Sequence, residues 1–254
     1  MTNGGGEIKV KSLQKALKVL ECFIEKQPLG VTEISEKLGL YKSNVHDILT
    51  TLTAMNYLSR SEESGKYYLG INTVRLGRAA ADRYNFQNIT IPHLQEIANE
   101  SGEISYLTIP LGYQVYYIAS VFPSGTNVHV SSILRDCLEG MYCTSSGKAM
   151  LAFMPEEFVD EYLALPLQRL TSYTITEPET LRRELERVRL RGYAVDNQES
   201  AIGLRCVAAP ILSYSGAVLG AISISGPSPR FDEDQIKQFA ALIKKHVAEI
   251  SRSL

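Results

Sequence analysis

Two strand-like segments near the C-terminal end constrain the fold most, because together they require a β-sheet. The segments "GLRCVAAPIL" and "AVLGAISIS" flank the turn "SYSG", a pattern that predicts a β-hairpin. Side chains alternate between the two faces of a strand, so Ser223 and Ser225 share one face while the neighbouring isoleucines share the other. What the two serines face decides whether this part of the sheet is solvated or covered.

The serine-bearing face predicts a ligand pocket. On the first strand of the hairpin, Leu204, Cys206 and Ala208 also share a face. If the two faces coincide, the sheet is lined there by small and weakly polar groups. Such groups leave a hollow, in which hydroxyls can orient a polar ligand. The alternative is an ordinary half-solvated antiparallel sheet with the serines in water.

The N-terminal part has helical periodicity and predicts a winged helix-turn-helix. Helical patterns in "SLQKALKVLECFIEK", "VTEISEKLG" and "YKSNVHDILTTLTAMNYL", with a glycine turn after the second, match the helix-turn-helix signature. The following "YLSRSEESGKYYLG" predicts two short strands around a loop, the wing. The predicted core positions of the first and third helices are Leu13, Ala16, Leu17, Leu20, Phe23, Ile24, Val45, Ile48, Leu49, Leu52 and Met55.

The polar face of the third helix predicts DNA recognition. It carries short polar side chains and few long charged ones, so it could lie deep in a major groove; an ordinary solvated face is the alternative. The residues expected at the groove are Ser43, Asn44, His46, Asp47 and Thr50. The candidates for phosphate contacts are Lys9, Lys11, Lys42, Arg60 and Lys66, whereas Glu62 and Glu63 at the wing tip would repel phosphate.

The rest of the chain predicts a linker helix and an α+β domain. The segment "NTVRLGRAAADRY" is helical in pattern, and strand patterns follow in "ISYLTIPLGYQVYYIASV" and "NVHVSSIL". Further helices are expected over residues 147–153, 156–163, 178–191 and 232–254, without strict βαβ alternation. We therefore expect a winged helix-turn-helix domain over residues 8–71, a linker helix over 72–84 and an α+β domain over 85–254.

The segment "CTSSGKAMLAF" passes from loop to helix at Ser145 and Ser146. The free N–H groups at the start of a helix can hold a carboxylate; capping of the helix by either serine, without a ligand, is the alternative. A nucleotide-binding P-loop is not expected, because its first glycine would have to stand where this chain has Tyr142.

Composition and charge limit the function classes. The net charge of −2 argues against a wholly basic nucleic-acid binder, but residues 1–75 hold ten Lys and Arg against eight Asp and Glu. No apolar run is long enough to span a bilayer and no signal core is seen, so we expect a cytoplasmic protein without membrane contact. The four cysteines, Cys22, Cys137, Cys143 and Cys206, lack metal-ligand spacing, and neither a metal nor a cofactor is predicted.

An enzyme that uses Cys206 as a nucleophile or redox thiol is the rival interpretation. A nucleophilic cysteine needs a base or a positive environment. His46 lies in the predicted DNA-binding part, and no motif ties His93, His129 or His246 to Cys206. A small core thiol is the better explanation, and no catalytic residue is predicted.

With these residues in view, the chain resembles the IclR family of bacterial transcriptional regulators along essentially its whole length. The resemblance rests on the N-terminal helices and, with more specificity, on "CTSSGKAMLAF", "RGYAVDNQESAIGLRCVAAPI" and "GAISISGPSPRF" in this order. It implies a dimerising linker helix and a GAF-like domain that binds a small organic acid. The matching effector contacts are Ser145, Ser146, Asp196, Leu204, Cys206, Ser223 and Ser225.

These observations predict a transcriptional regulator without catalytic activity. Its expected partners are a double-stranded DNA operator, a small carboxylic-acid effector and further copies of itself in a homodimer or homotetramer. One helix-turn-helix with modest positive charge makes few base contacts, so two half-sites are needed for useful affinity.

Overall fold

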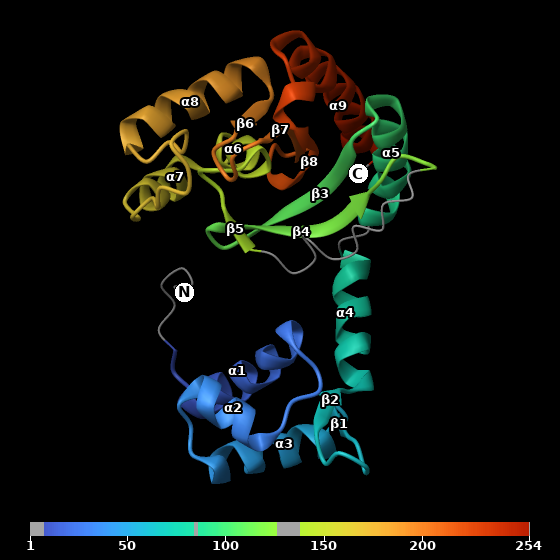
Figure 1. Ribbon diagram of the computed structural model, residues 1–254, viewed down its shortest axis with the longest axis vertical. Coiled ribbons are helices and arrows are strands. Elements are labelled where there is room, and N and C mark those ends of the chain that lie inside the picture. Colours follow the sequence, from blue (N-terminus) through green and yellow to red (C-terminus); the bar gives the residue numbers. More distant parts are fainter. Residues whose placement is uncertain (1–7, 84–85, 126–137, 254) are drawn as a thin grey trace. The chain divides into compact units, whose positions relative to one another are not determined.

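The computed structural model describes residues 8–83, 86–125 and 138–253. The chain divides into two compact units, Met1–Asn85 and Phe86–Leu254, which are coloured blue to teal and green to red in Figure 1. The predicted strand "NVHVSSIL", Cys137 and His129 lie outside the described residues. Within those residues, no helix combines the length and the apolar character that crossing a membrane requires.

The N-terminal unit is the predicted winged helix-turn-helix followed by a helix. Its elements are α1 (Lys11–Glu25), α2 (Val31–Leu38), α3 (Lys42–Ala54), β1 (Leu58–Arg60), β2 (Tyr67–Leu69) and α4 (Ile71–Arg83). Gly39 ends α2 in the left-handed conformation, with φ of 63°, and so provides the turn into α3. Strands β1 and β2 pair antiparallel and form the wing.

Part of the predicted N-terminal core is wrong. Val19, Cys22 and Phe23 are buried on α1, whereas Leu13, Leu17 and Ile24, which were expected to face inward, are each more than half exposed. The reason is that α1 has apolar side chains on more than one face, and periodicity alone does not tell which face meets α2 and α3. Met55 is also exposed, because it lies just beyond the end of α3.

The C-terminal unit is an α+β domain around one antiparallel sheet. The strands lie in the order β5-β4-β3-β8-β7-β6. The elements are α5 (Phe86–Ser101), β3 (Ile104–Leu111), β4 (Gln114–Val121), β5 (Leu138–Gly140), α6 (Ser145–Leu151), α7 (Glu156–Leu163), α8 (Pro178–Arg191), β6 (Ala194–Asn197), β7 (Leu204–Leu212), β8 (Val218–Pro227) and α9 (Glu233–Ser253). The predicted hairpin is confirmed as β7 and β8; the short strands β5 and β6 were not predicted.

The two faces of the sheet are covered by different helices, as Figure 1 shows. One core contains Val207, Ile222 and Ile224 together with apolar residues of α5 and α9. The other core contains Ala208 and Ala221 together with residues of α6, α7 and α8. Because the serines of β8 alternate with Ile222 and Ile224, they lie on the face covered by α6.

Candidate functional site

The polar face of α3 is exposed in the N-terminal unit. All five residues predicted for the major groove, and Lys42 beside them, are exposed, while Val45 and Leu49 on the opposite face are fully buried. The hydroxyl of Thr51 donates to the carbonyl of Asp47 at 2.8 Å, a bond within the helix. The helix therefore presents one continuous polar surface to solvent, as groove recognition requires.

Three of the cations predicted to contact phosphate, Arg60 and Lys66 on the wing and Lys42 on α3, have different surroundings. Lys66 Nζ lies 3.0 Å from Glu33 Oε2, so its charge is partly compensated. Arg60 is exposed; its Nε donates to the carbonyl of Gly65 at 3.2 Å, and its guanidinium lies over the ring of Tyr67. Lys42 is exposed at the first position of α3. Lys42 thus offers the least encumbered positive charge of the three.

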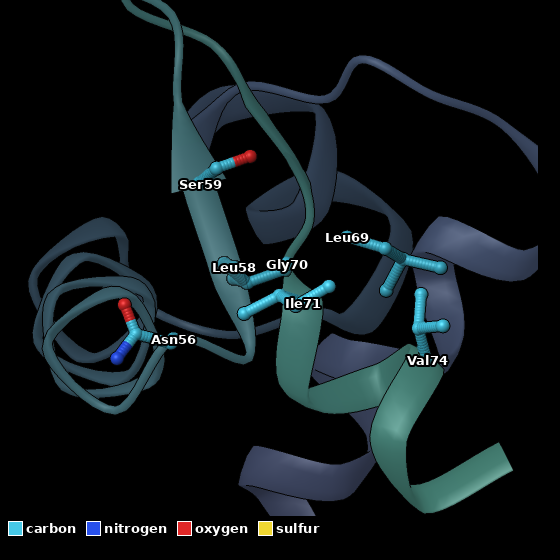
Figure 2. A pocket seen from close by; sticks show the side chains of 7 residues that line it. All are labelled: Asn56, Leu58, Ser59, Leu69, Gly70, Ile71 and Val74. Atoms are coloured by element: carbon cyan, nitrogen blue, oxygen red, sulfur yellow. The ribbon is translucent and has the colours of Figure 1, made fainter. Parts of the chain in front are cut away.

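An apolar hollow of about 390 Å³ lies where the wing meets the start of α4 (Figure 2). The side chains of Ile71 and Val74, on the first turns of α4, are exposed to 62% and 54%. The residues that line the hollow are Asn56, Leu58, Ser59, Leu69, Gly70, Ile71 and Val74. The hollow itself was not singled out from the sequence, although the pattern of the linker helix places Val74 on its apolar side.

The strand register brings the small and polar residues of the hairpin onto one face. Cys206 lies opposite Ser225, and Ala208 lies opposite Ser223. Asp196 on β6 lies opposite Cys206. Directly opposite residues point to the same side of an antiparallel sheet, so Asp196, Cys206 and Ser225 form one row. Ser223 is only 2% exposed, which excludes the solvated alternative for that serine.

This polar face continues across the sheet through residues that sequence reasoning missed. Tyr106 on β3 lies opposite Ser223, and its ring meets that of Tyr117 edge to face. The hydroxyl of Tyr117 donates to Glu139 Oε2 at 2.7 Å. Burial raises the pKa of the Glu139 carboxyl, although the bond from Tyr117 opposes this shift. Only the non-local pairing of β3 with β8 brings these groups together, and no sequence motif marks it.

Asp196 has a structural role beside any ligand contact. Its Oδ1 accepts from the backbone N–H of Glu199 at 2.7 Å, and its Oδ2 accepts from the hydroxyl of Ser200. These bonds hold the turn that follows β6. Burial raises the pKa of the Asp196 carboxyl, while the bonds from the turn oppose the shift.

The start of α6 is capped by Thr144 and not by either serine. Thr144 Oγ1 accepts from the backbone N–H of Gly147 at 3.0 Å. The alternative of a cap at Ser145 or Ser146 is therefore wrong, and the N–H of Gly147 already donates to Thr144. Both serines are 2% exposed and form the first turn of the helix.

The "GK" pair in this segment serves packing and a buried ion pair. A Cβ atom at Gly147 would lie 2.3 Å from Met141 Cα, so only glycine permits this approach of the helix to the preceding turn. Lys148 is 1% exposed, and its ammonium contacts Glu199 Oε1. The other carboxylate oxygen of Glu199 is buried and has no hydrogen-bond partner among the described residues.

The surroundings of the hairpin residues Leu204 and Cys206 bear on whether the Cys206 thiol could act as a nucleophile. Leu204 is partly buried at the start of β7, and Cys206 is 7% exposed. Burial and the nearby Asp196 carboxylate raise the pKa of the Cys206 thiol well above its usual range. Since the thiolate is the reactive form, this environment argues against a nucleophile. Cys22 and Cys143 are likewise buried, and neither forms a disulfide with another described residue.

Comparison with known proteins gives one family for both units. A model of the IclR helix-turn-helix domain matches residues 12–62, and a model described as bacterial transcriptional regulator IclR C-terminal matches residues 78–252. The transcriptional repressor IclR of Escherichia coli is 30% identical over 246 residues, which cover 96% of this chain and 89% of that protein.

Two solved structures show the same fold. The IclR protein of Thermotoga maritima is 34% identical, with a TM-score of 0.74 and coverage of 96% of this chain and 98% of that one. An IclR homolog from Microbacterium hydrocarbonoxydans, solved in complex with 4-hydroxybenzoate, has a TM-score of 0.82 at 22% identity and covers 96% of this chain and 100% of that one. At that identity the second likeness concerns the fold alone.

Proposed function

The chain belongs to the IclR family of bacterial transcriptional regulators, and on this premise we propose that a small organic acid controls its binding to a DNA operator. The observation that carries the proposal is the covered polar face of the sheet, where Ser223, Cys206 and Asp196 are all buried. A purely structural sheet face would bury apolar side chains, because buried hydroxyls and carboxyls cost free energy unless they find partners.

Residues 8–71 form the DNA-binding domain in this proposal, residues 72–84 the linker and residues 85–254 a GAF-like effector domain. Recognition uses the exposed face of α3 in the major groove, with Lys42 and Arg60 on phosphates and a smaller contribution from Lys66. A protein of this kind acts on DNA, so we place it in the cytoplasm. It works as a homodimer or homotetramer on paired half-sites.

The effector site contains Ser223, Ser225, Cys206 and Leu204 from the hairpin, Asp196 from β6, and Ser145 and Ser146 at the start of α6. Ionised carboxylates only accept hydrogen bonds, so Asp196 and the unpartnered Glu199 oxygen favour a ligand that offers hydroxyl donors. The backbone N–H groups of Ser145 and Ser146 are suited to the ligand carboxylate, since that of Gly147 is occupied by Thr144. A hydroxylated organic acid satisfies both requirements.

The 4-hydroxybenzoate complex of the homolog from Microbacterium hydrocarbonoxydans supports this class of ligand, because it shows that the same fold can hold a hydroxy acid. The residues Tyr106, Tyr117 and Glu139 extend the polar face and are proposed to set the size and polarity of the far end of the site.

A thermal-shift screen against keto, hydroxy, sugar and aromatic acids tests the proposal. A ligand at 100 times its dissociation constant adds about 2.7 kcal/mol to the free energy of unfolding. Each hit is then titrated into a complex of the protein with a duplex selected from random DNA by the protein itself. A hit that shifts the unfolding temperature and also changes duplex affinity supports the proposal; catalytic turnover of the hit would contradict it.

A further inference from the structure

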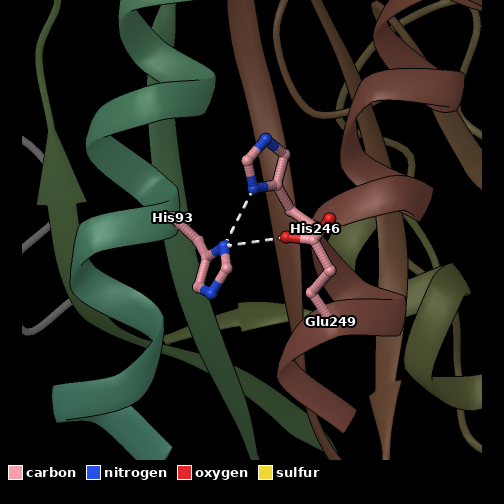
Figure 3. Close-up of side chains that lie close together, drawn as sticks. All are labelled: His93, His246 and Glu249. Carbon is pink, nitrogen blue, oxygen red and sulfur yellow. Dashed lines mark hydrogen bonds and ion pairs between the residues drawn. The ribbon is translucent and has the colours of Figure 1, made fainter. Parts of the chain in front are cut away.

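Helices α5 and α9 bring two histidines into direct contact on the side of the sheet opposite to the serines. His93 Nδ1 lies 2.9 Å from His246 Nδ1 (Figure 3). Glu249 Oε2 lies 3.8 Å from His93 Nδ1, and Glu96 Oε2 lies 3.8 Å from His246 Nδ1. Two imidazoles and two carboxylates thus converge from two helices.

The sequence arranges these four groups as a repeated pattern. Each helix carries a histidine followed three residues later by a glutamate, as His93 and Glu96 on α5 and as His246 and Glu249 on α9. Residues at this spacing share one helix face. Each carboxylate approaches the histidine of the other helix, so the four side chains form a crossed set rather than two separate pairs.

The imidazole pair presents both Nδ1 atoms to the same point between the helices. At 2.9 Å one Nδ1 donates its N–H to the lone pair of the other; a bound ion would replace this hydrogen bond, with both rings carrying their proton on Nε2. The ligand atoms of His93, His246 and Glu249 all lie within 4.8 Å of one another. In a tetrahedral zinc site the Zn–N distance of about 2.0–2.1 Å places two nitrogens about 3.4 Å apart, close to the spacing here.

The surroundings also suit an ion. His246 is 2% exposed, so one side of the site is dry. The side chains of Glu249 and Glu96 are 42% and 68% exposed and form the opposite, open side. This open side gives an ion a route into the site, while two carboxylates supply a neutralising charge.

We propose that His93, His246 and Glu249 bind a divalent transition-metal ion of the zinc, cobalt or nickel kind, with the Glu96 carboxylate beside His246 on the open side of the site. Imidazole with carboxylate favours such ions over magnesium and calcium, which prefer all-oxygen sites. The ion would clamp α5 to α9. Its role would be structural, because it would join two helices on the face of the sheet opposite to the serines.

The test uses the full chain, freed of any histidine tag and of metal by chelation. Cobalt(II) is titrated while the visible d–d absorption is recorded, and zinc affinity is measured by competition. We expect one ion per chain, a tetrahedral or five-coordinate cobalt spectrum without a thiolate charge-transfer band, and a raised unfolding temperature. A thiolate band would assign the ion to cysteine and overturn the proposal.

Variants locate the site. His93→Gln and Glu249→Gln are partly exposed positions that should fold, and each should weaken cobalt binding about 10- to 100-fold or more. His246→Gln is buried and serves as a second histidine variant if it folds. Glu100→Gln on α5 and His46→Gln on α3 are matched controls that should keep wild-type affinity. Equal losses in the controls, or no saturable binding by the wild type, would overturn the proposal.

Discussion

At the scale of single residues, two buried carboxyl groups, Asp196 and Glu199, and the partly buried Glu139 give this region of the C-terminal unit its chemical character. Burial raises the pKa of Glu139, Asp196 and Glu199 alike, and a different neighbour limits the shift of each: Tyr117, the Ser200 turn and Lys148. Burial favours the protonated carboxyl, which can also donate a hydrogen bond, whereas the neighbour of each group favours the ionised form, which only accepts. The hydroxyls of Ser223 and Ser225 are the adaptable groups of the covered sheet face, because a hydroxyl can both donate and accept.

Replacement of both Ser223 and Ser225 by alanine should weaken effector binding and leave the fold intact. Alanine fits a face already lined by Ala208 and Ala221, so the free energy of unfolding should change little. Effector affinity should fall by about 1–3 kcal/mol, because ligand groups are left without partners. Calorimetric titration of the identified effector into the Ser223→Ala, Ser225→Ala protein measures this loss. Ala217→Ser in the hairpin turn is a control, and unchanged affinity in the double variant would place the pocket elsewhere.

Single residues also show where sequence reasoning reached its limit. Alternation alone places Ser223 and Ser225 on one face of their strand and Cys206 on one face of the neighbouring strand, because a period of two is a local property. That the two faces coincide depends on the register, which the structure supplies. The functions of Gly147 and Lys148 were not predictable, since they depend on Met141 and on Glu199, and the latter lies 51 residues away along the chain. The same holds for His93 and His246, which are 153 residues apart and formed no motif.

At the scale of elements, Glu33 joins three parts of the N-terminal unit. Its carboxylate accepts from the backbone N–H of Gly30 at 2.8 Å and contacts Lys66 on the wing and Lys26 after α1. The bond from Lys66 is the main reason that the pKa of Glu33 falls from 4.5 to about 2. Folding therefore favours the ionised form of this side chain.

This contact predicts a pH-dependent contribution to stability. A carboxyl whose pKa is lowered by folding stabilises the protein above its unfolded pKa, and the contribution is lost as pH falls through the folded value. The advantage of wild type over Glu33→Gln should thus be full above pH 4.5 and shrink toward pH 2. Chemical denaturation of the two proteins at a series of pH values measures it, with Glu36→Gln on the same helix as control. A constant difference across this range would contradict the assignment.

Different residues of α3 should contact the DNA phosphates and the base edges. Lys42→Ala should weaken all DNA sequences alike and reduce the slope of log affinity against log salt by about 0.9, the value for one phosphate contact. Changes at His46 or Asp47 should instead alter base preference. Fluorescence anisotropy on selected and scrambled duplexes at several salt concentrations separates the two effects. Lys237→Ala on α9 removes the same charge elsewhere, and an unchanged slope in Lys42→Ala would exclude Lys42 from the phosphate contacts.

At the scale of the whole molecule, the elements were easier to predict than their assembly. The helix-turn-helix and the hairpin follow from patterns within about twenty residues, and the structure confirms both. The strand order β5-β4-β3-β8-β7-β6 joins β3 to β8 over more than a hundred residues, so local patterns could not give it. The short strands β5 and β6 have three and four residues, too few for alternation to be visible.

Exposed apolar residues on α4 suggest where two copies of the chain would contact each other in a dimer. Ile71, Val74 and Leu76 are 62%, 54% and 56% exposed, and the first two border the hollow beside the wing. A single helix-turn-helix with few free cations makes too few contacts for tight operator binding, whereas two linked copies gain affinity through their effective concentration. We therefore expect a symmetric dimer with its seam along α4.

Val74→Asp should break this seam. The introduced carboxylate would be buried in an apolar contact without a partner, so the variant should sediment as a monomer. Its affinity for a duplex with two half-sites should fall about 100-fold or more, because the gain from binding both half-sites at once is lost. Affinity for a single half-site should stay the same, because the face of α3 is untouched. Leu190→Asp on α8 is the matched control, since Leu190 is 89% exposed but lies in the other unit. A wild-type protein that sediments as a monomer at micromolar concentration and still binds the full site tightly would refute the dimer.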